Sequence, residues 1–158
     1  YALAHGETQF LFLDTQAFFG IPGQPQQDAW LAERLADPRF RRTVPVFHVP
    51  AYSSGLHGNA DSWPVGRGWG PVFAGAAVPL ALTGHDHNYE RLQVGEMACV
   101  VSGGGSGTLY GKDIVLAESQ VFETRSHYVL LELYTDRLDL SAVDAGGAVF
   151  DQVTIALP

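Results

Sequence analysis

Short, nearly continuous apolar runs alternate with polar stretches rich in glycine and proline over the first two thirds of the chain. Apolar runs of this length, bounded by turn residues, are typical of strands that are buried on both faces. They predict four buried strands, at residues 8–15, 43–47, 78–83 and 98–102. We therefore expect a central sheet in which these runs form the core.

One helix is expected between the first two of these strands. Asp28 has a side chain suited to a helix N-cap, and the helix it predicts continues to about Ala36, with Trp30 and Leu31 on one face. Residues 49–70 are rich in proline, serine and glycine and predict a long loop. A loop of this length in a compact domain is usually functional or disordered.

The last third of the chain alternates between apolar and polar residues. Segments 127–134, 137–143 and 148–155 predict antiparallel strands, with a turn at residues 144–147. The whole pattern predicts an α/β fold with α+β character, in which a mixed sheet comes first and an antiparallel meander follows. We find no repeat or linker, so a single domain over residues 1–158 is expected.

Composition and charge exclude several classes of function. The formal net charge is −8, and a nucleic-acid backbone is not an expected partner because its binding needs a basic face. An acidic protein can still bind phosphate when metal cations lie in its site. Cys99 is the one cysteine, so an intramolecular disulfide is excluded, and its apolar neighbours predict a buried thiol. No run could span a bilayer and no leader begins the chain, so we expect a soluble chain whose compartment stays unknown.

Three of the six histidines have a spacing that suits metal binding. His85 and His87 follow an apolar strand and a glycine, and in extended backbone this spacing points both rings to one side. His48 also follows an apolar strand directly, so the three imidazoles can meet at one edge of the sheet. Neutral imidazole suits zinc, iron, nickel and copper. The alternative is that each histidine only holds a backbone carbonyl, and we assign that structural role to His5 and His127.

The segment LTGHDHNYER around these histidines resembles the GHxHxYER signature of calcineurin-like metallophosphoesterases, in particular their purple-acid-phosphatase-like branch. Four further segments resemble that branch in the same order: FLFLDT, QDAWLAERLA, VPVFHVPAYSSGLHG and VVSGGGSG. The resemblance extends from about residue 1 to residue 107. It implies that the chain is the C-terminal half of the αββα sandwich of that family.

The resemblance also implies roles for individual residues. His48 and His85 match two ligands of one metal, and His87 matches a ligand of the neighbouring metal. His57 matches a histidine that contacts phosphate or protonates the leaving group, although a loop histidine beside glycines is otherwise often solvent-exposed. The residues expected to shape a substrate pocket are Tyr52, Asn88 and Tyr89. Glu90 and Arg91 are expected to form a structural ion pair or backbone contacts.

The family's N-terminal motifs are missing from this sequence. DxH, GDxxD and GNHD, whose middle aspartate bridges the two metals, do not occur, and residues 58–61 (GNAD) imitate the last one only weakly. Two divalent cations about 4 Å apart repel strongly without a bridging carboxylate. We therefore expect at most one tightly held metal, unless Asp61, Asp86 or Glu90 of another copy replaces the bridge. We also expect a truncated domain with an open strand edge, covered by a homo-oligomer or by a second chain.

The sequence thus predicts a metal-dependent phosphoric-ester hydrolase, a phosphatase or phosphodiesterase, that uses metal-bound hydroxide. The expected cofactor is one or two divalent ions, with zinc, manganese and iron all possible. The choice among monoesters, diesters and nucleotides stays open. Two alternatives remain: a non-catalytic metal-binding or interaction remnant of the fold, and one fragment of a longer two-metal enzyme.

Overall fold

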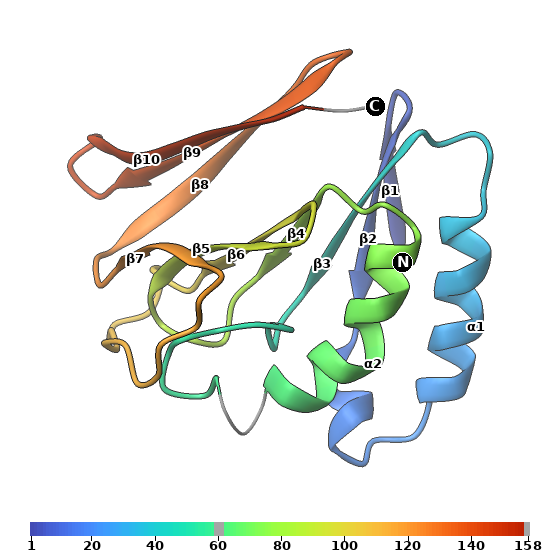
Figure 1. Ribbon diagram of the computed structural model, residues 1–158, viewed down its shortest axis with the longest axis horizontal. Helices are drawn as coiled ribbons and strands as arrows, with labels where there is room; N and C mark the ends of the chain where they lie inside the picture. The colour runs from blue at the N-terminus through green and yellow to red at the C-terminus, as the bar shows by residue number, and fades with distance from the viewer. Residues whose placement is uncertain (59–61, 157–158) are drawn as a thin grey trace.

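The computed structural model describes residues 1–58 and 62–156, and it contains a seven-stranded mixed sheet, a three-stranded antiparallel sheet and helices (Figure 1). The α/β prediction, with its mixed sheet and C-terminal meander, is confirmed. The elements are, in chain order, β1 (Ala2–His5), β2 (Thr8–Leu13), the 3-10 helix η1 (Thr15–Phe19), α1 (Gln24–Leu35), β3 (Arg42–Phe47), α2 (Ser62–Gly75), β4 (Leu80–Thr83), β5 (Tyr89–Val94), β6 (Met97–Ser102), β7 (Ser119–Glu123), β8 (His127–Leu133), β9 (Arg137–Asp144) and β10 (Val149–Ala156).

The large sheet has the strand order β1-β2-β3-β4-β6-β5-β7. The four apolar runs predicted as strands are β2, β3, β4 and β6, and these pair in parallel at its centre. β1, β5 and β7 pair antiparallel and were not predicted. All three are short and carry polar residues, so they lack the apolar runs of the central strands.

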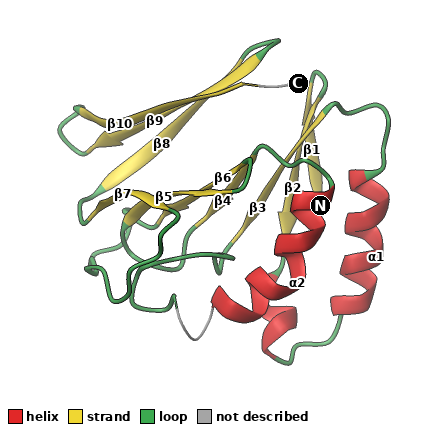
Figure 2. Cartoon of the chain, in the orientation of Figure 1, coloured by secondary structure: helices red, strands yellow, loops and turns green. Residues whose placement is uncertain are grey.

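Two apolar cores lie on opposite faces of this sheet. Figure 2 shows α1 and α2 on one face of the sheet. There, Leu31 of α1 and Trp69 and Phe73 of α2 pack against the central strands. On the other, Leu138 and Leu140 of β9 pack against the same strands, so the three-stranded sheet β10-β9-β8 covers that side. Cys99 belongs to the helix-side core and is buried, as predicted.

Both helices differ from the sequence prediction. α1 begins at Gln24, with Gly23 at the N-cap and a proline in the first turn, so Asp28 is not the cap. The Asp28 carboxylate instead accepts hydrogen bonds at Oδ1 from Trp69 Nε1 (2.9 Å) and Gln24 Nε2 (2.7 Å). The predicted loop over residues 49–70 is also too long, because α2 occupies its last part.

β8 leaves one face of the three-stranded sheet open. Its residues alternate in burial, and the outward-facing Tyr128 and Leu130 are 56% and 48% exposed. β8 is also an edge strand of its sheet, since it pairs with β9 alone. Within residues 1–58 and 62–156, no helix has the length and apolar character needed to cross a membrane.

Candidate metal centre

His48 and His85 meet where two neighbouring parallel strands end. β3 ends at Phe47 and β4 at Thr83, and their registers align Val46 with Leu82. This register sets Gly84 opposite His48, and the Gly84 amide donates to the His48 carbonyl oxygen at 3.1 Å. The next side chain, His85, therefore emerges beside His48, at the carboxyl edge of the sheet where ligands of such sheets bind.

The two rings face each other through their nitrogens. His85 Nδ1 lies 3.2 Å from His48 Nε2, and the ring planes cross at 78°. Two imidazole nitrogens that share a tetrahedral zinc ion at about 2.0–2.1 Å are separated by about 3.3 Å. Burial lowers the pKa of His48, and the neighbouring His85 and His87 lower it further. The neutral imidazole that results is the form that binds a metal.

His87 and His57 lie beside this pair. His87 stacks on Tyr110 with 4.4 Å between ring centroids, and its Nδ1 lies 2.8 Å from the Thr108 carbonyl oxygen. A carbonyl only accepts, so Nδ1 carries the proton and Nε2 of His87 presents its lone pair. The His57 ring lies 4.6 Å from that of His85 and 5.8 Å from that of Tyr110. The structure therefore brings all four predicted histidines to one place.

A depression of about 300 Å³ opens over this cluster. It is lined by His48, Gly84, His85, His87, Ser102, Gly103, Gly105 and Ser106. Among the residues that the structure describes, no three histidine, cysteine, aspartate or glutamate side chains converge closely enough to surround a metal ion. The pair His48 and His85 is thus a partial ligand set, and a metal there needs water, phosphate or further side chains to complete it.

Two of the carboxylates considered as replacements for the bridge, Asp86 and Glu90, do not line the depression. Asp86 and Glu90 are both fully buried, and both accept hydrogen bonds from the loop that carries His57. Asp61 lies outside the described residues. Arg91 forms its ion pair with Asp151 on β10, at 2.7 Å, and Glu90 makes backbone contacts, as expected of this pair.

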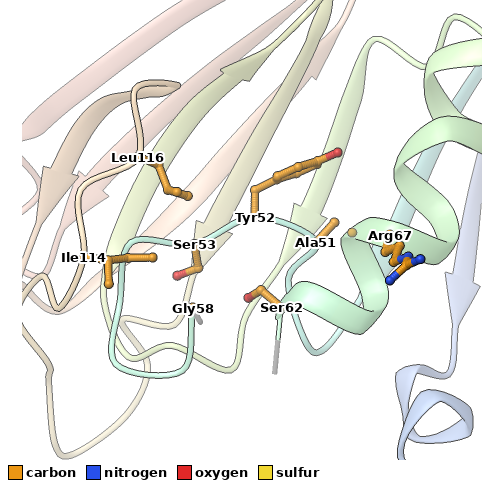
Figure 3. Close-up of a pocket in the computed structure, with 9 residues that line it drawn as sticks. Ala51, Tyr52, Ser53, Gly58, Ser62, Arg67, Ile114 and Leu116 are labelled. Atoms are coloured by element: carbon orange, nitrogen blue, oxygen red, sulfur yellow. The ribbon is translucent and has the colours of Figure 1, made fainter. Parts of the chain in front are cut away.

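The residues expected to shape the substrate pocket lie elsewhere. Tyr52 lines a separate cavity of about 360 Å³ between its loop and α2, and Figure 3 shows its ring projecting toward that helix. Tyr89 is fully buried, and its hydroxyl donates to Asp151 Oδ2 at 2.6 Å. Asn88 is also fully buried, and neither polar atom of its amide has a hydrogen-bond partner among the residues that the structure describes. The structure thus does not bring these three side chains to the histidines.

Sequence reasoning missed Tyr110 and Ser102. Tyr110 stacks on His87 but follows a glycine-rich segment without any hydrophobic period that could place it. Ser102 ends β6 and lies 3.1 Å, through its Oγ, from His127 Nε2. Its position at the end of a strand beside β4 was the available signal, because parallel strands β4 and β6 end at the same edge.

Comparison with known proteins supports this fold assignment. No protein-family profile matches the sequence, and no curated protein matches it. Solved structures do match, and among them are GAP50, the anchor in the inner membrane complex of Plasmodium; the purple acid phosphatase PPD1 from yellow lupin (Lupinus luteus) seeds; and a dimetal phosphatase from Danio rerio. Their sequence identities to this chain are 21%, 21% and 18%, and their TM-scores are 0.84, 0.78 and 0.58.

The matches cover most of this chain but only part of each neighbour. They span 100%, 99% and 84% of this chain and 53%, 32% and 38% of the three neighbours. The chain is therefore about half as long as GAP50 and about a third as long as the lupin enzyme. At these identities the comparison establishes the fold: the chain has the fold of calcineurin-like metallophosphoesterases.

Proposed function

On this metallophosphoesterase fold, we propose that the chain serves in metal-dependent hydrolysis of phosphoric esters, with one divalent metal position held by His48 and His85. The observation that carries the proposal is the 3.2 Å separation of His48 Nε2 from His85 Nδ1. That separation agrees with the distance of about 3.3 Å between two imidazole nitrogens that share one tetrahedral zinc ion. Without an ion, the same two nitrogens form an N–H···N hydrogen bond.

The donor set indicates which ions fit. Imidazole nitrogens suit zinc and iron, while manganese is included because of the family resemblance, and His87 Nε2 supplies a third donor toward a neighbouring position. A divalent cation held there contributes Lewis acidity, which withdraws charge from a phosphoryl oxygen and makes water more acidic. No carboxylate of the described residues lines the depression, so the residues fit one cation and not a closely spaced pair.

His57 is proposed to serve the leaving group. Its ring packs 4.6 Å from that of His85, so it borders the place where a phosphoryl group contacting the metal position would lie. An imidazole at that border can hold a proton and deliver it to the departing alkoxide or phenolate oxygen. The ester class stays open between monoesters, diesters and nucleotides.

The experiment compares hydrolysis by three forms of the chain, each loaded in turn with zinc, manganese or iron(II). These are the wild type, the double variant His48→Ala, His85→Ala, and the matched control His5→Ala, which removes an exposed histidine of β1. Phenyl phosphate and bis(p-nitrophenyl) phosphate serve as substrates. We expect the wild type and His5→Ala to agree, and the double variant to lose at least about 100-fold in kcat/KM. Equal rates in the wild type and the double variant would refute the proposal.

A second candidate function is a non-catalytic interaction module. GAP50 is named as an anchor, and the partial ligand set and the exposed Tyr128 and Leu130 of β8 are the observations that fit this alternative. Under this alternative, β8 and its open face contact a partner or a second copy. Substitution of Tyr128 and Leu130 by serine would then abolish association in sedimentation, while metal binding would not change.

In a third arrangement, the chain takes part in the same hydrolysis but supplies only some of the metal ligands. Acidic ligands supplied by a second polypeptide, or by a further segment of a longer protein, would complete two metal positions around His48, His85 and His87. Addition of such a segment should then raise the metal content from one ion to two per chain, measured by elemental analysis.

A further inference from the structure

Alternate residues of the histidine segment point to opposite sides. His85 and His87 are partly exposed at the depression, whereas Asp86, Asn88 and Glu90 are each 0% exposed. A buried carboxylate loses its hydration, and that loss is offset only when hydrogen bonds replace it. The partners of Asp86 and Glu90 therefore show what these two side chains do.

The partners of Asp86 belong to the loop over residues 53–57. Asp86 Oδ1 accepts from the backbone amide of His57 at 2.9 Å, and Oδ2 accepts from Ser53 Oγ at 2.5 Å. Ser53 Oγ in turn accepts from the Gly55 amide at 3.0 Å. The carboxylate thus fixes both ends of a tight turn, and charge-assisted hydrogen bonds of this kind are about twice as strong as neutral ones.

Glu90 fixes the beginning of the same loop. Its Oε2 accepts from the Ser54 amide at 2.7 Å, and its Oε1 accepts from Ser119 Oγ at 2.6 Å. The Ser54 carbonyl oxygen accepts from the amides of Asp113 and Ile114, at 2.8 and 3.1 Å. Both peptide groups of Ser54 are therefore held by neighbouring segments.

Gly55 allows the loop to lie directly on Asp86. A Cβ atom at residue 55 would come within 2.6 Å of Asp86 Cγ and 2.8 Å of Asn88 Oδ1. No side chain larger than glycine fits without moving the loop or the carboxylate. The contact is therefore closely packed as well as hydrogen-bonded.

We propose that Asp86 and Glu90 are positioning residues, which hold residues 53–57 so that the His57 imidazole faces His85. The role of His57 in this statement rests on the proposed function. His85 and His87 face the depression, while Asp86 between them and Glu90 after them orient the proton donor on the opposite loop. One short segment thereby couples the placement of metal ligands to the placement of His57.

The first test is hydrogen exchange, which needs no substrate. Amide exchange is followed by NMR in the wild type, Asp86→Ala, the conservative Asp86→Asn, and the matched control Asp151→Asn, which removes another buried carboxylate on β10. We expect the His57 amide to exchange at least about tenfold faster in Asp86→Ala, with partial recovery in Asp86→Asn and no change in Asp151→Asn. Equal acceleration in Asp151→Asn, or none in Asp86→Ala, overturns the proposal. Where Asp86→Ala does not fold, Ser53→Ala removes one arm of the same network and should accelerate the Gly55 amide.

The second test is a double-mutant cycle of Asp86→Ala with His57→Ala, on phenyl phosphate and p-nitrophenyl phosphate. Phenolate is the stronger base and gains more from a proton donor, so Asp86→Ala should lower kcat for phenyl phosphate by at least about tenfold and less for the nitrophenyl ester. The zinc affinity should not change in Asp86→Ala, and adding Asp86→Ala to His57→Ala should not lower kcat further. If the reductions in kcat caused by the two single substitutions multiplied in the double variant, the positioning role would be overturned. A wild-type chain without hydrolysis would refute the proposed function, while the exchange data would still decide how the loop is held.

Discussion

Asp151 on β10 joins the two sheets through β5. Its carboxylate accepts two hydrogen bonds from the Arg91 guanidinium, at 2.7 and 3.0 Å, and one from the Tyr89 hydroxyl at 2.6 Å. The Arg91 and Asp151 side chains are only 16% and 7% exposed. Replacing Asp151 with alanine leaves Arg91 charged, largely buried and without its carboxylate.

The size of the effect follows from this burial. Removing one partner of a buried ion pair costs about 3–5 kcal/mol, because the remaining charge stays desolvated. The pair keeps some exposure, so we expect Asp151→Ala to lower the free energy of unfolding by about 3 kcal/mol. The double variant Arg91→Met, Asp151→Ala should be less destabilised than Asp151→Ala alone, since no unpaired charge remains.

The assay is urea unfolding followed by far-UV circular dichroism. Burial alone would raise the pKa of Asp151, but the hydrogen bonds from Arg91 and Tyr89 lower it below its ordinary value of 3.8. A carboxyl whose folded pKa is lowered stabilises the fold above its unfolded pKa and loses that contribution as the pH falls through the folded pKa. The wild type should thus lose stability below about pH 4 in part through Asp151, and Asp151→Ala should lack that part. If Asp151→Ala lowered the free energy of unfolding by less than about 1 kcal/mol at pH 7, the stabilising role of the buried ion pair would be refuted.

Further predictions concern two glycines, the Cys99 thiol and the partly buried His127. A Cβ at Gly104 would lie 2.0 Å from His127 Nδ1, whereas nothing lies within 4 Å of a Cβ at Gly105. Gly104→Ala should therefore lower the free energy of unfolding by about 1–3 kcal/mol in thermal unfolding, and Gly105→Ala should lower it by almost nothing. Equal effects of the two substitutions would contradict this. Burial raises the pKa of Cys99 to about 12, so iodoacetamide at pH 8 should label it only in urea, and rapid native labelling would show the core to be open. Burial also lowers the pKa of His127 below 6.5, so the fold should lose stability as the pH falls from about 6.5 toward the folded pKa, and His127→Gln should remove that slope in acid titrations of unfolding. An unchanged slope would show that other groups cause it.

The central strands could be predicted because their sequences contain little except apolar residues. β5 could not, since it carries Glu90 and Arg91, and their burial is possible only through partners distant in sequence: Ser54 and Ser119 for one, Asp151 for the other. Tertiary hydrogen bonds therefore stabilise β5 as a strand, although its local sequence pattern disfavours one.

α2 was missed for a related reason. Gly66, Gly68, Gly70 and Pro71 are poor helix formers, and the helix forms because Trp69 and Phe73 are buried against the sheet. The glycines allow close packing: a Cβ at Gly70 would lie 2.4 Å from the Tyr52 hydroxyl oxygen. The Tyr52 side chain therefore lies against α2 and not beside the histidines, where the sequence had predicted it.

The histidines of the candidate site could be predicted from strand-end spacing and from the family resemblance together. Strand ends place His48 and His85, because β3 and β4 are parallel neighbours. The inward direction of Asp86 agrees with the spacing of His85 and His87 on either side of it. The positive φ of 67° at His85 and the hydrogen bonds that Asp86 accepts from Ser53 and His57 could not be read from the sequence, because they depend on a loop distant along the chain.

The metal position at His48 and His85 is tested most directly by a zinc titration of the purified chain, with isothermal calorimetry and elemental analysis of the same sample. The account predicts one tightly bound zinc ion per wild-type chain, and an affinity at least about 100-fold weaker in His48→Ala, His85→Ala. His5→Ala should bind zinc as the wild type does. Zinc binding of equal affinity and stoichiometry in the double variant would contradict the account.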